Sequence, residues 1–319
     1  MGLPELLKTQ FDKYHEILCR IDFESVEQDV IIAISVVINK IIKSLNIVRM
    51  DNTSEIWEEE ICPLCRRHPI FQILSEDPYT NRAYNKPRGY AGDSVMLDFI
   101  YSGTLLGDTS NRGKSLFAAT TGLPTGASVR LRMHHLANML DDLSQDKKSA
   151  IIVSLACGHF REGCFSNAVQ LGKIEKIIAY DHDAESLAVA AEVSELVNPI
   201  NTSILNILAG KINIESNNFI YAAGLFDYLS DRAAGRLLEK MIQSLLPGGT
   251  ALVANFIPAT HGRAYMESFM DWWLIYRDEQ DLVNLLPSSI KLGSTASFGI
   301  KTYKDTYRNI AYLEIKKIE

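Results

Sequence analysis

The residues best suited to chemistry follow two short apolar runs. The first run, 151–155, ends at a turn that contains Ala156 and Gly158, and the second run, 177–180, ends at Asp181. Two apolar runs separated by a helix-length segment predict a strand, a tight turn, a helix and a second strand. In open parallel sheets a nucleotide binds at the carboxyl ends of the strands, where an acid binds the ribose hydroxyls. The spacing therefore predicts a nucleoside site with Gly158 in the turn and Asp181 on the ribose.

The turn favours a nucleoside that carries no pyrophosphate. A dinucleotide-binding turn reads G-x-G-x-x-G, whereas this turn has fewer glycines, and no lysine follows to hold a phosphate. These features argue against a nicotinamide-dependent oxidoreductase. The stretch resembles motif I and the acidic loop of class I methyltransferases that use S-adenosylmethionine (SAM). It departs from their E/D-x-G-x-G-x-G pattern at Ser154, Ala156 and Phe160. The resemblance implies that SAM is the co-substrate or sole substrate and that Ala156, Gly158 and Asp181 bind it.

The composition indicates a soluble globular protein. Of the 319 residues, 47% are hydrophobic and 22% are charged, the net charge is −7, and the pI is about 5.6. An acidic chain without basic runs is a poor partner for nucleic acids or anionic membranes. The five cysteines are too scattered for a disulfide scaffold, and the longest apolar run, 30–38, is too short to span a membrane. We predict a cytoplasmic protein with a small-molecule substrate, no nucleic-acid partner and no membrane span. A homodimer is one assembly that the sequence allows.

The first part of the chain is predicted to be helical. Apolar side chains recur at three- and four-residue steps, which predicts helices over 3–21, 26–45 and 54–60. Cys62 and Cys65 are followed by His68, but a structural zinc site needs four ligands. We interpret the two cysteines as buried small side chains at a helix end and predict no metal site. Residues 1–124 are expected to form a cap or lid, and residues 125–319 the SAM-binding core.

The stretch 75–93 mixes turn-forming residues, aromatic residues and charges without a regular period. Such mixtures are typical of loops that carry function. Arg88 offers a planar fork for a carboxylate, and Tyr90 offers an aromatic face and a hydroxyl. The structural interpretation is that Asp93 caps a helix over 94–101. The functional interpretation is a lid over SAM, with Arg88 as a cofactor-binding residue and Tyr90 as a catalytic one.

The same stretch carries a more specific resemblance. It reads E-D-P-Y-T-x-R-A-Y-x-K-P-R-G-Y-A-G-D-x-V-M-L-D-x-I-Y and precedes a class I core. From about residue 69 to the end, the chain resembles a bacterial group that contains 3-hydroxypalmitate methyl ester synthase and natural-product enzymes, including azetidine-2-carboxylate synthases. The resemblance implies methyl transfer to a carboxylate or heteroatom of a small or acyl metabolite in signal or natural-product biosynthesis. One alternative is a SAM cyclase that forms azetidine-2-carboxylate and methylthioadenosine. A second is a non-catalytic SAM-binding module.

The core is predicted to be an α/β fold, Rossmann-like, with a seven-stranded, mostly parallel sheet whose last strand is antiparallel. Beyond the first two strands, we expect strands over 202–205, 219–223, 250–256, 295–301 and 309–316. Helices are expected over 126–143, 185–197, 232–246 and 262–285. Arg130 and Arg132 lie on the helix before the first strand, and Arg132 is our candidate for binding the SAM carboxylate.

The remaining candidates take their roles from the resemblance to the superfamily. Asn206 and Ile207 are expected beside the adenine. Tyr221 and Asp227 are expected beside the sulfonium as catalytic residues, since aromatic faces and carboxylates attract a cation. Methyl transfer from SAM is an in-line displacement, so the enzyme must orient and desolvate the reactants. A carboxylate acceptor needs no base, whereas a hydroxyl or amine acceptor needs one.

Overall fold

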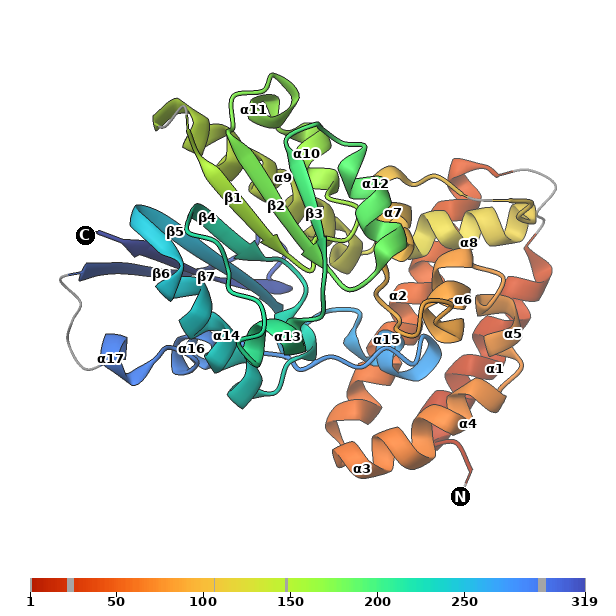
Figure 1. Cartoon of the computed structure of the whole chain (residues 1–319). Coiled ribbons are helices and arrows are strands. Elements are labelled where there is room, and N and C mark those ends of the chain that lie inside the picture. Colours follow the sequence, from red (N-terminus) through yellow and green to blue (C-terminus); the bar gives the residue numbers. More distant parts are fainter. Residues whose placement is uncertain (1, 22–25, 106, 147–148, 292–296, 319) are drawn as a thin grey trace. The chain divides into compact units, whose positions relative to one another are not determined.

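The computed structural model describes residues 2–21, 26–105, 107–146, 149–291 and 297–318 (Figure 1). The contacts divide the chain into two compact units. Unit 1 comprises Met1–Val129 and Ala259–Trp273, and unit 2 comprises Arg130–Pro258 and Leu274–Glu319. The short segment 259–273 therefore groups with the N-terminal helices, although the chain on both sides of it belongs to unit 2. The domain division at residue 124 stays a prediction.

Unit 2 contains a sheet that the described residues build from seven strands in the order β3-β2-β1-β4-β5-β7-β6 (Figure 1). Strands β1 to β5 run parallel, and β7 pairs antiparallel with both β5 and β6. The bounds are β1 (Ile151–Leu155), β2 (Lys176–Asp181), β3 (Val197–Asn201), β4 (Asn217–Ala222), β5 (Leu245–Phe256), β6 (Phe298–Lys304) and β7 (Ile310–Lys317). The predicted Rossmann-like sheet with an antiparallel last strand is confirmed.

Helices cover both faces of this sheet because side chains alternate along each strand. Val153 and Ile220 lie on one face, in a core shared with α13 (Ile204–Leu208), α14 (Asp231–Gln243) and α16 (Glu279–Asn284). The other face packs against α9 (Pro124–Asp146), since the His135 ring lies 5.3 Å from the Tyr312 ring of β7. The other helices of unit 2 are α10 (Arg161–Phe165), α11 (Asn167–Gln170), α12 (Ala184–Ala191), the 3-10 helix η2 (Phe226–Tyr228) and α17 (Ser288–Lys291).

The third strand lies earlier than expected. The predicted strand over 202–205 is wrong, because β3 ends at Asn201 and α13 begins at Ile204. The preceding helix α12 ends at Ala191, before the predicted end at 197. Proline lacks the N–H that an interior strand needs, and β3 contains Pro199. The strand order places β3 at the edge of the sheet, where a proline is tolerated.

The long helix predicted over 262–285 is also wrong. Helix α15 (Arg263–Phe269) ends early, and helix formation resumes only at α16. Between them, Asp271 has a φ of 46°, a left-handed conformation that interrupts a right-handed helix. Further on, the N–H of Arg277 donates to the carbonyl of Phe256 at the end of β5 (2.9 Å). Backbone groups of this segment therefore form hydrogen bonds with partners distant in sequence, which the periodicity of the local sequence does not predict.

Unit 1 is helical in its described residues. Its elements are α1 (Glu5–Arg20), α2 (Gln28–Met50), α3 (Ser54–Ile56), the π-helix η1 (Trp57–Ile61), α4 (Cys62–Arg67), α5 (Ile70–Leu74), α6 (Pro78–Asn85), α7 (Ser94–Ser102), α8 (Asn111–Thr121) and α15. Glu267 of α15 is 1% exposed and accepts hydrogen bonds from Trp57 Nε1 (2.8 Å), Arg49 Nε (3.0 Å) and Arg263 Nε (2.8 Å). This buried carboxylate ties the segment 259–273 to α2 and η1.

The cysteines of α4 are buried, as interpreted from the sequence. Cys62 and Cys65 are each 0% exposed, and burial raises the pKa of both thiols, that of Cys65 to about 12. The described residues contain no group of three or more His, Cys, Asp or Glu side chains that could hold a metal ion.

Helix α2 is the one helix, among the residues that the structure describes, that is long and apolar enough to cross a membrane. In its most apolar 18-residue window, 39% is buried inside the fold. The core helix of a soluble protein passes the same test of length and composition, so the test alone does not make α2 a membrane span.

Candidate functional site

In the turn after β1, every second residue has a left-handed backbone conformation. Ala156, Gly158 and Phe160 have φ angles of 52°, 55° and 52°. Only glycine adopts this conformation freely, and the other two residues each cost about 1–2 kcal/mol there. The chain thus keeps a glycine-type turn at two positions that hold alanine and phenylalanine. Surrounding contacts must enforce such a strained conformation, which is found most often at ligand-binding sites.

Asp181 is one of the residues that hold this turn. The Gly158 N–H donates to Asp181 Oδ2 (2.8 Å), and the Asp183 N–H donates to Oδ1 (3.0 Å). The Asp181 side chain is only 5% exposed. Gly158 and Asp181 were predicted from the sequence to share one site, and the structure places them in direct contact. Oδ1 also lies 3.3 Å from His182 Nδ1, whereas Oδ2 accepts the Gly158 N–H and has a second lone pair. The bond from Asp181 to a ribose stays a prediction.

The turn lies at the switch point of the sheet. From β1, the chain proceeds to β2 and β3 on one side, whereas β4 and β5 lie on the other side. In open α/β sheets, ligands bind in the crevice outside the carboxyl ends of the strands at this reversal. The turn 156–160 after β1 and the loop 223–228 after β4 therefore flank the expected ligand position.

Two of the predicted residues meet beside the loop after β4. Arg132 of α9 is 4% exposed, and its guanidinium lies 6.0 Å from the Phe256 ring centroid. A Cβ placed on Gly224 would lie 3.8 Å from both terminal nitrogens of Arg132. Asp227 is 2% exposed, and its Oδ1 accepts the N–H of Phe256 (2.7 Å). Burial raises the pKa of Asp227 to about 7, and this hydrogen bond and the nearby Arg132 charge act against that rise.

Tyr221 has a partner that the sequence analysis missed. Its hydroxyl donates to Glu162 Oε1 over 2.5 Å, and both side chains are buried, Tyr221 at 1% and Glu162 at 7% exposure. Burial raises the pKa of both groups. Tyr221 is also the register partner of Ser154, which stands where the resembled motif has an acid. Glu162 and Tyr221 are 59 positions apart, so no local pattern in the sequence indicated this contact.

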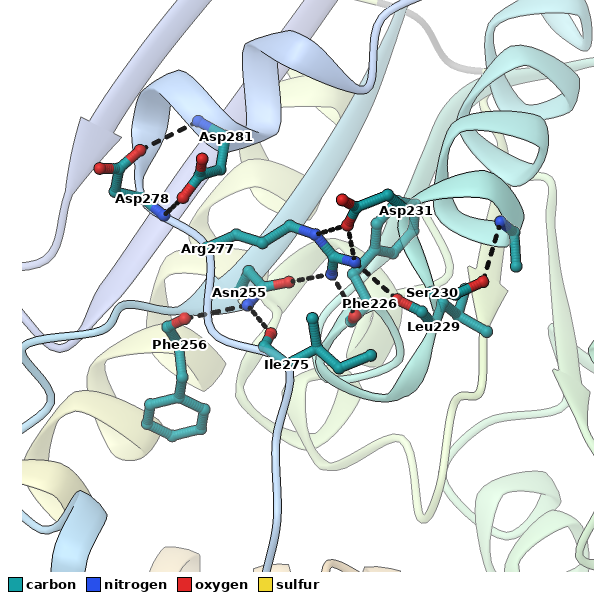
Figure 2. A network of polar contacts seen from close by, with 11 residues as sticks. Phe226, Leu229, Ser230, Asp231, Asn255, Phe256, Ile275, Arg277, Asp278 and Asp281 are labelled. Carbon is teal, nitrogen blue, oxygen red and sulfur yellow. Dashed lines mark hydrogen bonds and ion pairs between the residues drawn. The ribbon is translucent and has the colours of Figure 1, made fainter. Parts of the chain in front are cut away.

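The loop that carries Asp227 is held by Arg277, another residue that the sequence analysis did not select (Figure 2). Arg277 donates to the carbonyls of Phe226 (2.7 Å) and Leu229 (2.6 Å), to Asn255 Oδ1 (3.1 Å) and to Asp231 Oδ1 (2.6 Å). The loop after β4, the end of β5 and the start of α14 therefore share one buried guanidinium. The hydrogen bonds of Arg277 position the Asp227 loop, and the Arg277 charge is one of the influences that oppose the rise in the pKa of Asp227.

Asn206 and Ile207 do not lie at a strand end, contrary to the expectation. Both belong to α13, and Asn206 Nδ2 donates to Thr202 Oγ1 (3.2 Å). Ile207 is 0% exposed and is part of the core beneath the sheet. Their contact with an adenine stays a prediction.

Arg88 and Tyr90 belong to unit 1. Arg88 Nη1 donates to Ser94 Oγ at the start of α7 (3.0 Å). The predicted capping role of Asp93 is confirmed, since its Oδ1 accepts the N–H of Met96 (2.8 Å) and its carboxylate pairs with Arg82. The lid role of Arg88 and Tyr90 stays a prediction.

Comparisons with known proteins agree with the core as described. A family model for the tellurite resistance protein TehB matches residues 137–263, less than half of the chain. No curated protein sequence matches this chain. A solved structure of a possible exported protein from Bordetella parapertussis aligns with a TM-score of 0.63 at 14% identity, over 91% of this chain and 97% of that one.

Two solved methyltransferase structures align over part of the chain. The N-methyltransferase NodS from Bradyrhizobium japonicum WM9, in complex with S-adenosylhomocysteine, has a TM-score of 0.42 and 14% identity, over 60% of this chain and 88% of that one. A TehB-like SAM-dependent methyltransferase from Corynebacterium glutamicum has a TM-score of 0.40 and 12% identity, over 61% and 97%.

The strand topology identifies the fold. Strand order β3-β2-β1-β4-β5-β7-β6 with an antiparallel β7 is the Rossmann-like fold of class I SAM-dependent methyltransferases. The candidate site lies at the switch point of that fold, where buried charges gather around a strained turn.

Proposed function

We propose that this protein is a SAM-dependent methyltransferase that acts on a small-molecule acceptor. One observation carries the proposal: the left-handed turn 156–160 is held by Asp181 at the switch point, with Arg132 and Asp227 beside the facing loop. A ligand there meets a ribose-binding acid, a buried cation and a buried acid. That set matches the ribose, the carboxylate and the positively charged end of SAM.

The residues present fit SAM better than a dinucleotide. The turn offers the N–H groups and the close backbone that a nucleoside needs, and no described contact supplies a lysine for a phosphate. When bound, SAM supplies a methyl group on a positively charged sulfur. Asp181 would hold the ribose, and Arg132 would hold the α-carboxylate through a bidentate, charge-assisted contact. The protein then contributes orientation and exclusion of water.

Asp227 favours an acceptor that loses a proton. Among the described residues, one hydrogen bond reaches the Asp227 carboxylate, and it is accepted by Oδ1. A pKa of about 7 is well matched to general-base work at neutral pH. A carboxylate acceptor would instead bring a second negative charge beside Asp227. We therefore expect a hydroxyl or amine acceptor, with Asp227 taking its proton, within signal or natural-product biosynthesis.

The decisive experiment is mass spectrometry of the purified protein with SAM, first alone and then with hydroxy fatty acids and small amines. Formation of S-adenosylhomocysteine that depends on an acceptor would support the proposal, and a methylated hydroxyl or amine in the product, as opposed to a methyl ester, would support the role of Asp227. Methylthioadenosine and a four-carbon cyclic amino acid from SAM alone would contradict it and identify a SAM cyclase. Calorimetric binding of SAM without turnover of any acceptor class would indicate a binding module instead.

The remaining expectations extend this proposal. Arg88 and Tyr90 would close over the acceptor as a lid, and the enzyme would work in the cytoplasm. We expect Arg88→Ala and Tyr90→Phe to lower turnover more than they lower the melting temperature. A variant with a lower melting temperature but normal turnover would show that these two residues have a structural role only.

A further inference from the structure

Glu162 is a buried acid that has no role in the proposed methyl transfer. It lies in α10, which follows the turn at the switch point, and its carboxylate is fixed by the Tyr221 hydroxyl. Removing a carboxylate from water is unfavourable unless a cation or several donors compensate. A leucine or methionine would fill the same space without that penalty. The presence of an acid here therefore calls for a positive partner.

The loop after β4, on the other side of the switch point from α10, lies beside a buried positive charge. Glu162 follows β1, whereas the Arg132 guanidinium lies beside Gly224, which follows β4. The Arg132 charge acts on Glu162 and on Asp227, so the three groups share one electrostatic environment. A buried carboxyl group and a buried guanidinium thus stand on the two sides of the switch point.

A zwitterion is the ligand group that matches this arrangement. An α-amino acid carries an ammonium and a carboxylate on one carbon, and each would meet a group of opposite charge. Charge-assisted hydrogen bonds of this kind are about twice as strong as neutral ones. The chain has no acid at Ser154, the position of the acid in the resembled motif, so the negative charge comes from α10 instead.

We propose that Glu162 is a specificity-determining residue that binds the α-ammonium group of the nucleoside ligand, with Tyr221 as the positioning residue that orients its carboxylate. The inference rests on the proposed function and deepens it. It selects nucleosides that carry an amino-acid tail over nucleosides that lack one. Arg132 supplies the matching contact to the α-carboxylate.

The test measures calorimetric dissociation constants for two ligands. The first is S-adenosylhomocysteine, and the second is its analogue with hydrogen in place of the α-amino group. Glu162→Gln keeps the shape and can still accept the Tyr221 hydrogen bond. We expect it to raise the dissociation constant of S-adenosylhomocysteine at least about tenfold, as expected for the loss of one charge-assisted hydrogen bond. The dissociation constant of the deaminated analogue should change by less than about twofold. Tyr221→Phe should show the same selective loss, although a smaller one.

The control is Glu195→Gln, which removes an exposed carboxylate of the same unit and should leave both dissociation constants unchanged. Equal weakening of both ligands by Glu162→Gln would overturn the inference, because it would show that Glu162 only supports the turn. Unchanged binding of S-adenosylhomocysteine would overturn it as well. If the wild-type protein binds neither ligand, the proposed function itself fails, which is a separate result.

Discussion

Truncation of Arg277 should destabilise unit 2 far more than neutralisation of the acid to which it is paired. Arg277 is 2% exposed and donates five hydrogen bonds within the described residues (Figure 2). The Asp231 side chain at the other end of the ion pair is 82% exposed. Water can replace the contacts of Asp231, whereas the hydrogen bonds from Arg277 to the Phe226 carbonyl and to Asn255 Oδ1 are buried.

The expected magnitude follows from the acceptors that lose their donor. In Arg277→Met, the described hydrogen bonds leave the Leu229 carbonyl and Asn255 Oδ1 without a protein donor, while the Phe226 carbonyl keeps the N–H of Leu229. A buried acceptor left unsatisfied, such as Asn255 Oδ1, costs roughly 1–3 kcal/mol, and the partly buried Leu229 carbonyl costs less, so the free energy of unfolding should fall by about 3 kcal/mol. Asp231→Asn removes an exposed charge and should cost about 0–1 kcal/mol.

Urea denaturation followed by far-ultraviolet circular dichroism measures both variants. Trp57, Trp272 and Trp273 are the three tryptophans of the chain, and all belong to unit 1. Tryptophan fluorescence in the same titration therefore shows whether the loss is confined to unit 2. Equal destabilisation by Arg277→Met and Asp231→Asn would refute the reasoning, because it would assign the energy to the ion pair and not to the buried acceptors.

Three further outcomes are expected. Asp181→Asn leaves one acceptor oxygen for the N–H groups of Gly158 and Asp183, so in thermal melts the free energy of unfolding should fall by about 1–3 kcal/mol. The affinity for SAM, measured by calorimetry, should fall at least about tenfold. An unaltered affinity would exclude a ribose contact. Because the Asp227 pKa of about 7 in the folded state lies above its ordinary value, its stabilising contribution is present below about pH 4 and is lost as pH rises through about 7. Asp227→Asn keeps the Phe256 hydrogen bond, so at pH 8 it should be more stable than the wild type, on the order of 4 kcal/mol, and far less active. This difference in stability should nearly vanish at pH 4, and a difference that stays constant with pH would contradict the pKa shift. A maleimide should label two of the five thiols in the native protein, the exposed Cys19 and Cys164, because burial raises the pKa of the other three. Peptide mapping that finds early labelling of Cys62, Cys65 or Cys157 would disprove this prediction.

Much of the fold and part of the site were open to prediction from the sequence. Apolar runs that end at a turn or an acid predicted β1, β2 and the carboxyl edge on which Gly158 and Asp181 meet. Capping residues also act locally, so Asp93 was assigned correctly, and Thr53 and Ser230 likewise cap helices through N–H groups three residues ahead. These features depend on neighbours within a few residues, and for that reason the sequence alone determines them.

The tertiary structure decided what depends on partners far apart in the chain. Glu162 and Tyr221 are separated by 59 positions, and Arg277 and Phe256 by 21, so no spacing links them. The tolerance of Pro199 in β3 follows from an edge position that only the finished sheet defines. The pKa of Asp227 is raised because the assembled fold excludes water from its carboxylate. Burial and long-range contact are properties of the packed chain, and they determine which charges at the switch point can act on a ligand.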